Sequence, residues 1–313
     1  MSALPLTLIF FAALIHAGWN LVAKKSGGDM FFALLMTLAH IVVWAPVGGW
    51  FIWQQAGQLG PLQWGLIFAS GTLHLAYFAC LLRGYRLGDL SVVYPLARGS
   101  GPLVTALVAT TFFGESLRLI GWLGVLAIVS GILLIAGGPA LIRAFLNPDQ
   151  SDKAHTALRA GVIYGLVTGL FIATYTLVDG YAVKHAGISP ILVEYLGNLT
   201  RLPLLIVVLL IMHRREQPAP GTPLRSRLGL QLSLQLKQTW KHALLIGAVA
   251  PISYTLVLFA ATMAPLSQVA PARELSMLFA SLFGGRLLGE RDAGMRLFGA
   301  LCIAAGVIAL VSV

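Results

Sequence analysis

Two stretches of the sequence resemble each other: Leu-Ser-Val-Val-Tyr-Pro-Leu-Ala-Arg at residues 90–98 and Leu-Ser-Gln-Val-Ala-Pro-Ala-Arg at residues 266–273. Each stretch opens an apolar segment that ends in a Gly-Glu step, at residues 114–115 and 289–290. Because the same features follow one another in the same order at both places, the chain is predicted to contain an internal duplication.

The duplication predicts how the chain is divided. A further apolar segment rich in small residues follows each Gly-Glu step, over 119–137 and 295–313. We therefore predict a first repeat over 1–137, a linker over 138–157 and a second repeat over 158–313. Small residues let helices approach closely in lipid, so these two segments are expected to pack within the chain, with a dimer face as the alternative.

The composition is that of a membrane protein. The chain has 313 residues, of which 58% are hydrophobic and only 10% are charged, and its mean hydropathy is +0.86. A soluble protein of this length needs more charge to cover its surface. A helix of about 20 apolar residues crosses the hydrocarbon core. We predict an all-α integral membrane protein with ten transmembrane helices, over 4–23, 31–53, 62–82, 90–113, 119–137, 158–180, 188–212, 242–263, 266–288 and 295–313.

Positive charge is distributed unevenly over the predicted connections. Connections after odd-numbered spans hold most of the Lys and Arg residues, many of them in a basic cytoplasmic loop over 213–241 that is expected to lie on the surface or to be poorly ordered. Connections after even-numbered spans hold only Arg118 and Lys184. Since positive residues favour the cytoplasmic side, both termini are predicted to lie outside the cytoplasm. The chain is expected to reside in the cell (inner) membrane.

Corresponding connections of the two repeats carry opposite charge biases. The connection between spans 2 and 3 is uncharged, whereas its counterpart between spans 7 and 8 is the most basic. Two repeats of five spans in opposite orientations require this exchange, and parallel repeats do not. Inverted five-helix repeats are typical of secondary transporters.

The sequence favours neither nucleic-acid binding nor catalysis. Its net charge is +10, but no basic stripe or RNA-binding motif accompanies that charge. The His residues are scattered, and no HExxH, GxSxG or Walker A motif occurs. Cys80 and Cys302 lie in different apolar segments, which indicates packing rather than a disulfide or a metal site. We predict no catalytic residue, no cofactor and no metal.

Several motifs give the chain a family resemblance. They are His16-Ala17-Gly18-Trp19-Asn20, the stretch from Gly88 to Pro95, the stretch from Ala173 to Gly180, and the two Gly-Glu steps. With these motifs the chain resembles the drug/metabolite transporter superfamily, specifically its ten-helix EamA-type members, outside the two long connections. The resemblance implies transport of a small solute, although such transporters move amino acids, nucleotide sugars, drugs and other metabolites.

Two arginines are predicted to lie near the middle of the membrane. Arg98 and Arg273 each lie less than halfway into their spans, which start from opposite sides, so the two guanidiniums should flank the midplane. A charge at this depth usually faces the bundle interior or a wet cavity. Guanidiniums match carboxylate and phosphate oxygens, so both are expected to contact an anionic or zwitterionic solute. The alternative is structural ion pairing, with Glu274 or Glu194 among the available carboxylates.

Other polar residues lie within the apolar spans. Glu194, Asn198 and Arg201 share one helix face, and Tyr175 and Asp179 share another. Such polar faces should line a cavity, and Tyr175, Asn198 and Arg201 are predicted to contact the solute. The remaining predicted solute contacts are aromatic or polar residues of three other spans, Trp19, Asn20, His74, Tyr77 and Tyr94. Packing is the alternative for the histidine and the tryptophan, and an interfacial position is the alternative for Asp179 and Glu194.

The prolines and the glutamates of the duplicated stretches are expected to have structural roles. Pro95 and Pro271 precede the two arginines and favour a kink or an opening of the helix. Glu115 and Glu290 are predicted to cap helices or to form ion pairs with nearby arginines such as Arg118, and not to bind solute.

These observations predict a secondary transporter that moves a small anionic or zwitterionic metabolite, of the amino-acid, organic-acid or phosphonate type, by alternating access. The alternative is a flippase for a lipid-linked phosphate or sugar. The predicted partners are the solute and the lipid bilayer, without nucleic acid, and the chain is expected to be a monomer or a homodimer. Glu274, Asp179 and Glu194 are the candidates for proton coupling.

Overall fold

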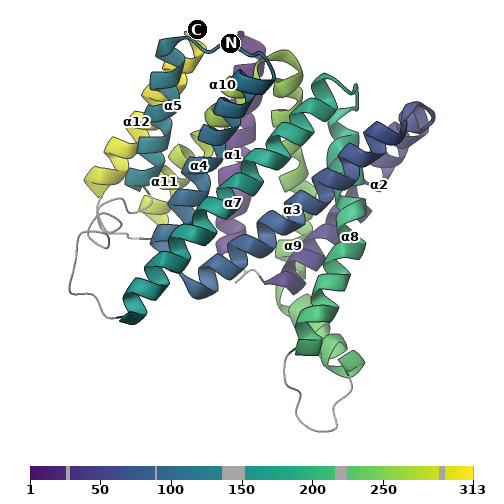
Figure 1. The fold of residues 1–313 in the computed structure, drawn as a ribbon. Helices are drawn as coiled ribbons and strands as arrows, with labels where there is room; N and C mark the ends of the chain where they lie inside the picture. The colour runs from purple at the N-terminus through teal and green to yellow at the C-terminus, as the bar shows by residue number, and fades with distance from the viewer. Residues whose placement is uncertain (26–28, 89, 136–151, 216–223, 289–292, 313) are drawn as a thin grey trace.

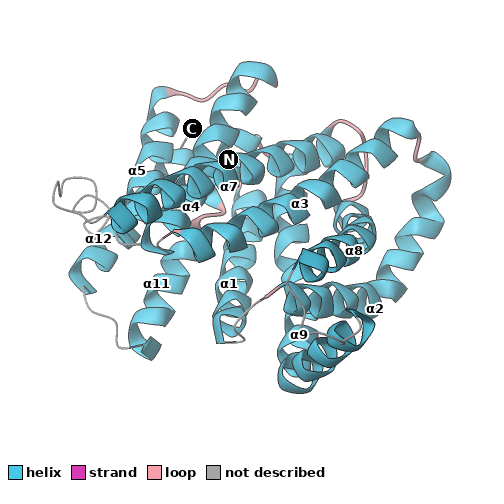
Figure 2. Ribbon diagram, turned by 60° about the horizontal axis from the view of Figure 1, so that its bottom comes forward, coloured by secondary structure: helices cyan, strands magenta, loops and turns pink. Residues whose placement is uncertain are grey.

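Helices account for nearly all of the chain that the structure describes (Figure 2). The structure, a computed structural model, describes all residues except 26–28, 89, 136–151, 216–223, 289–292 and 313. The helices are α1 (Ala3–Lys25), α2 (Met30–Gln55), the short 3-10 helix η1 (Ala56–Gln58), α3 (Pro61–Leu87), α4 (Leu90–Phe112), α5 (Leu119–Ile135), α7 (Asp152–Lys184), α8 (Pro190–Arg215), α9 (Leu224–Met263), α10 (Leu266–Ala272), α11 (Leu275–Leu288) and α12 (Ala293–Val311). No strand occurs among the described residues, and the predicted all-α class is confirmed.

The helices are those of a multi-pass membrane protein. Seven of them, α1, α2, α3, α4, α7, α8 and α9, are long and apolar enough to cross a membrane. α5 and the apolar part of α12 are shorter, and the ninth predicted span is divided into α10 and α11. Large apolar side chains are exposed on the surface, with Trp53 at 75% and Phe112 at 80%. Soluble proteins rarely expose so much apolar surface, whereas lipid covers it.

The two halves pack on each other in a reciprocal pattern. α1 packs on α9 as α7 packs on α3, and α2 lies against α9 as α8 lies against α3. The last helices of the halves, α5 and α12, pack side by side (Figure 1). Five spans per half place the second half upside down relative to the first, and the predicted fold of two inverted repeats is confirmed.

The two termini lie together at one end of the bundle (Figure 1). The ammonium group of Met1 donates to the carbonyl oxygen of Val311 at 3.3 Å. An even number of membrane crossings has this result, because it returns the chain to the side on which it began.

Helical structure extends into both long connections. The predicted linker over 138–157 lies mostly outside the described residues, but α7 already begins at Asp152. The last part of the linker is therefore helical. The division into repeats over 1–137 and 158–313 stays a prediction.

The predicted loop over 213–241 is wrong for residues 224–241, which form the first part of α9. Leucines at every second position do not predict a helix, but residues four apart share a helix face. Leu228 and Leu232 pack against α2 and α8, while Leu230 is exposed. The alternating leucines thus supply a packed face and an exposed face to one continuous helix.

The ninth predicted span is broken near its middle. Arg273 and Glu274 form a turn that separates α10 from α11. Pro271 has no N–H to donate within α10, and the amide of Glu274 donates to the Pro271 carbonyl at 3.0 Å, which ends the helix. The expected opening is found after Pro271, whereas α4 continues through Pro95 without a break.

Glu115, in the connection between α4 and α5, caps the start of α10. Its carboxylate oxygens accept hydrogen bonds from the backbone N–H groups of Leu266 and Ser267, both at 2.8 Å. The ammonium group of Lys184 lies 3.4 Å from the same carboxylate. The predicted capping role is confirmed, with a lysine at the end of α7 as the ion-pair partner in place of a neighbouring arginine. Glu290 lies outside the described residues.

α5 and α12 approach each other at facing glycines. A β-carbon on Gly131 would lie 2.5 Å from the carbonyl oxygen of Gly299, and one on Gly299 would lie 2.8 Å from the carbonyl oxygen of Gly131. Gly124 and Gly306 face each other in the same way. Glycine permits this approach because it adds no side chain between the helices. The expected packing within the chain is therefore confirmed.

We expect Gly131→Ala to destabilise the protein by about 1–3 kcal/mol, because the new methyl group forces α5 away from α12. The matched control is Gly18→Ala on α1, where nothing lies within 4 Å of an added β-carbon. That variant should be as stable as the wild type or slightly more stable, since alanine favours the helix. Thermal unfolding in detergent measures both, and equal melting temperatures would contradict the close approach.

Candidate functional site

Two arginines from different halves meet one buried glutamate at the break in the ninth span. Arg98 on α4 places Nη2 3.0 Å from Oε2 of Glu274. Arg273, in the turn between α10 and α11, places Nε 3.7 Å from the other oxygen of the same carboxylate. Glu274 is 0% exposed. We call Arg98, Arg273 and Glu274 the arginine cluster.

The pairing in the arginine cluster is ionic rather than well hydrogen-bonded. Both carboxylate oxygens of Glu274 and the Nε atoms of both arginines are buried and lack a hydrogen-bond partner among the described residues. Arg98 donates instead to the hydroxyl of Ser276 at 3.2 Å. Ser276 was not among the predicted contacts, because its contact with Arg98 depends on the packing of α4 beside the broken span. The structural ion pairing that was the alternative for both arginines is present.

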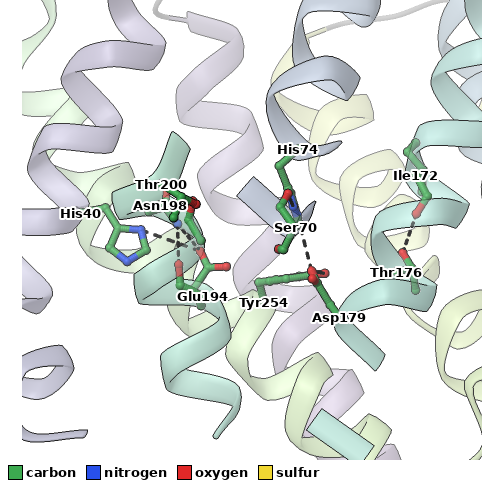
Figure 3. A network of polar contacts seen from close by, with 11 residues as sticks. His40, Ser70, His74, Ile172, Thr176, Asp179, Glu194, Asn198, Thr200 and Tyr254 are labelled. Atoms are coloured by element: carbon green, nitrogen blue, oxygen red, sulfur yellow. Dashed lines mark hydrogen bonds and ion pairs between the residues drawn. The ribbon is translucent and has the colours of Figure 1, made fainter. Parts of the chain in front are cut away.

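A second polar group forms around Asp179, which is 0% exposed. The hydroxyl of Tyr254 on α9 donates to Oδ2 of Asp179 at 2.6 Å. Nε2 of His74 on α3 lies 4.0 Å from the same oxygen, and Nδ1 of His74 lies 2.9 Å from the backbone oxygen of Ser70. Figure 3 shows the four side chains converging between α3, α7 and α9. Asp179 thus lies inside the bundle and not at the interface, and we call these four residues the Asp179 cluster.

Aromatic rings cover the Asp179 cluster on one side. The ring of Tyr175 stacks on the His74 ring at a centroid distance of 4.0 Å. Tyr77 and Tyr254 meet the Tyr175 ring edge to face, at 5.8 and 6.2 Å. The structure therefore brings the predicted residues His74, Tyr77 and Tyr175 together. Tyr254 on α9 completes the group. In the sequence it could be noticed as a tyrosine within an apolar span.

The predicted polar face of the seventh span lies on α8. The amide of Asn198 donates to Oε1 of Glu194 at 3.1 Å, and Nδ1 of His40 on α2 lies 3.8 Å from that oxygen (Figure 3). His40 was not among the predicted contacts, although it is a histidine within an apolar span, as His74 is. Arg201, one turn further along α8, has no carboxylate within ion-pair distance among the described residues, and its Nε atom is buried without a partner.

The remaining predicted contacts are occupied by packing or by local hydrogen bonds. The side-chain amide of Asn20 donates to the backbone oxygen of His16 at 2.8 Å, within α1. Trp19 packs beside the core of α2 and α9 and meets the His16 ring edge to face at 4.8 Å. The Tyr94 hydroxyl donates to the sulfur of Met277 on α11 at 3.2 Å, about one helical turn from Arg98 on α4.

The arginine cluster and the Asp179 cluster adjoin. Ala97, the residue before Arg98 on α4, packs in one buried cluster with Tyr175, and Tyr254 packs against the same cluster. The two groups therefore form one polar interior that is lined by both halves. Within the described part of the chain, no three His, Cys, Asp or Glu residues gather in a way that could hold a metal ion.

We expect Tyr254→Phe to destabilise the protein by about 1–3 kcal/mol, because it leaves the buried Asp179 carboxylate without its donor. Asp179→Leu should also destabilise, but the double variant should lose less than the sum of the two losses. Reversible unfolding in mixed micelles measures this coupling. Tyr77→Phe is the control, since it removes a hydroxyl from the same aromatic group without contacting Asp179. Additive losses would contradict the hydrogen bond.

Comparisons with known proteins agree with this architecture. The sequence matches the model of the EamA-like transporter family over residues 3–137 and 159–312. A relative from Sinorhizobium sp., named "Uncharacterized transporter in cobO 3'region", is 34% identical over 127 residues, which are 40% of this chain and 89% of that relative. A solved structure described as "Crystal structure of protein" covers 99% of this chain and 96% of its own chain, with a TM-score of 0.67 at 14% identity, a likeness of fold. With one family match on each half, the resemblance is confirmed, and the chain belongs to the EamA-like transporter family.

Proposed function

We propose that the chain is a secondary transporter in the inner membrane that moves a small anionic or zwitterionic metabolite, of the amino-acid, organic-acid or phosphonate type. The observation that carries the proposal is the arginine cluster, in which Arg98 from the first half and Arg273 from the second meet inside the bundle. A charge within a membrane span is costly and is usually retained for function. Because each half supplies one guanidinium, a bound acid group would contact both halves.

The groups around the arginine cluster suit the rest of such a solute. The planar guanidiniums can hold a carboxylate, phosphate or phosphonate group. The adjoining Asp179 carboxylate can accept from an ammonium group, and the rings of Tyr175 and Tyr254 can face its positive charge. An amino acid or an amino-phosphonate carries both charges within one small molecule. Asn198 and Arg201 on α8 extend the polar lining beyond Asp179.

The break in the ninth span supports alternating access. Arg273 and Glu274 lie where α10 ends and α11 begins, so a tilt of either short helix moves charged groups of the solute site. Glu115 attaches the start of α10 to the first half. We propose that the halves rock about the solute, with α10 moving as part of one gate. No catalytic step is involved, and the termini face away from the cytoplasm.

The alternative of a flippase for a lipid-linked phosphate or sugar is not favoured. The family description and the name of the relative both refer to transporters. The chain is proposed to work as a monomer or a homodimer.

Uptake by purified protein in sealed vesicles tests the proposal. A panel of labelled amino acids, organic acids and phosphonates should contain at least one solute whose uptake is saturable. Arg98→Ala should reduce that uptake by about tenfold or more, and Arg98→Lys by less, because lysine keeps the charge but loses the planar fork. Lys237→Ala, which removes an equal charge from the exposed part of α9, should transport like the wild type. Saturable uptake that is equal in all three variants would contradict the role of Arg98.

Among the three proton-coupling candidates, we propose Asp179 as the proton carrier. Glu274 faces two guanidiniums, and Glu194 accepts from the amide of Asn198. Asp179 accepts from a tyrosine hydroxyl, and its Oδ1 atom is buried without a hydrogen-bond partner among the described residues.

Several charged or titratable groups face the Asp179 carboxylate. Tyr254 approaches from α9, His74 from α3, Arg201 from α8, and Arg273 from the turn between α10 and α11. Because His74 belongs to the first half and the other groups to the second, a relative movement of the halves would change the surroundings of the carboxylate and allow it to take up or release a proton.

We expect uptake to rise when the vesicle interior is made alkaline, because protons then enter with the solute. Asp179→Asn should abolish this response, and Asp179→Glu should restore part of it because a titratable group returns. The measurement is initial uptake with and without the gradient at constant membrane potential. Wild-type uptake that does not change with the gradient would contradict proton coupling but not the proposed transport.

A further inference from the structure

We propose that Glu274 is an internal competitor of the transported anion: its carboxylate occupies the guanidinium pair Arg98–Arg273, and the acid group of the solute displaces it. This inference rests on the proposed function for the identity of the solute. It adds that the empty site is held by a charge of the protein itself, and that binding of the solute must release that charge.

The geometry of the arginine cluster indicates that Glu274 can be replaced by another anion. A guanidinium that binds a carboxylate well makes two parallel hydrogen bonds of roughly 2.7–2.9 Å. Glu274 has one contact of 3.0 Å to Arg98 and one of 3.7 Å to Arg273, and both of its oxygens lack a well-formed hydrogen bond to the described residues. The carboxylate is therefore held by charge and burial, without the directional bonds that would fix it.

The guanidiniums retain donors for another anion. Each guanidinium has five N–H groups. Among the described residues, only Nη2 of Arg98 makes a hydrogen bond, to Ser276, and the Nε atoms of both arginines are buried without a partner. A carboxylate or phosphonate of a solute can supply the acceptors that these donors lack.

The two anions compete because they need the same guanidiniums. Two guanidiniums and one carboxylate leave one positive charge, which attracts an anion into the cluster. An anion that contacts both guanidiniums would, however, lie next to the Glu274 carboxylate in a buried site, and two like charges repel each other there. The incoming acid group therefore binds well only when the carboxylate leaves the pair.

The position of Glu274 links this exchange to the broken span. Glu274 lies in the turn between α10 and α11, and its backbone N–H already bonds to Pro271 across the break. The carboxylate can leave the guanidiniums by rotation of its side chain, and the turn then loses its ionic attachment to Arg98. Occupation of the site by an anion would thus change the junction at which α10 can tilt.

Anion binding by the purified full-length chain in detergent tests the inference, with thermal stabilisation as the readout. The probe is methylphosphonate at constant ionic strength, with methylammonium as the cation control. In Glu274→Gln, half-maximal stabilisation by methylphosphonate should need an about tenfold lower concentration than in the wild type, because the competing charge is gone. Methylammonium should show no such gain.

Asp29→Asn is the matched control. Asp29 caps α2 by accepting from the backbone N–H of Phe32 at 2.8 Å, and asparagine keeps that capping ability. The substitution removes the same charge outside the bundle interior, so its response to methylphosphonate should equal that of the wild type. Combining Arg98→Lys with Glu274→Gln should cancel most of the gain, which would locate the gain at the arginine cluster.

An equal or weaker response of Glu274→Gln would overturn the inference, as would a gain of the same size in Asp29→Asn. If Glu274→Gln does not fold, Glu274→Asp replaces it. The shorter carboxylate cannot reach both guanidiniums, and a gain of about twofold or more is expected; no gain would again overturn the inference. This experiment measures binding, so it is independent of transport. A chain that binds the anion in competition with Glu274 but takes up no solute would contradict only the proposed function. A chain that takes up solute without such competition would contradict only this inference.

Discussion

A backbone polar group in hydrocarbon must find its partner within the protein, and this constraint explains most of the structure. It makes the described chain helical, and it makes any interruption of a helix expensive unless other groups satisfy the freed N–H and C=O groups. The interruption of the ninth span is satisfied in this way. Glu115 accepts the first N–H groups of α10, and Glu274 donates its own N–H across the break. The broken helix is stable because the other half of the molecule takes part in it.

The same cost applies to side chains, and it arranges the polar interior. Arg98, Arg273 and Glu274 share a buried position because each would be costly there alone. Asp179 has a tyrosine hydroxyl, and Glu194 has an asparagine amide. Arg98 belongs to the first half and Glu274 to the second, so a relative movement of the halves would change the partner of each of these charges. A membrane protein whose charges are paired across its moving parts is suited to respond to a charged solute.

Much of the fold could be predicted from the sequence, because it follows from patterns that a single chain displays. The duplicated stretches at 90–98 and 266–273 and the uneven positive charge indicated two inverted repeats. The first part of α9 could not be predicted in this way, since leucines at every second position become a helix face only when α2 and α8 lie beside them. The two prolines were equivalent in sequence, yet only the span that contains Pro271 is broken, with Glu115 available to cap it.

The candidate site was less predictable, because its contacts join residues far apart in the sequence. Arginines within spans could be recognised as functional candidates from the cost of burying them. Which carboxylate lies between them could not be recognised, since Arg98 meets Glu274 only through the packing of α4 on the break in the ninth span. Ser276 and His40 were missed for the same reason. The role of a hydroxyl or an imidazole in an apolar span depends on the residues of the helix that it faces.

The length of α9 has a mechanical consequence. Its 40 residues extend over about 60 Å, roughly twice the thickness of the hydrocarbon core. The helix is thus longer than one crossing requires. Pro251 separates its first part, which packs against α2 and α8, from the part that carries Tyr254 beside Asp179. Since a proline inside a helix favours a bend, a change of the bend at Pro251 would alter the packing of the first part of α9 on α2 and α8.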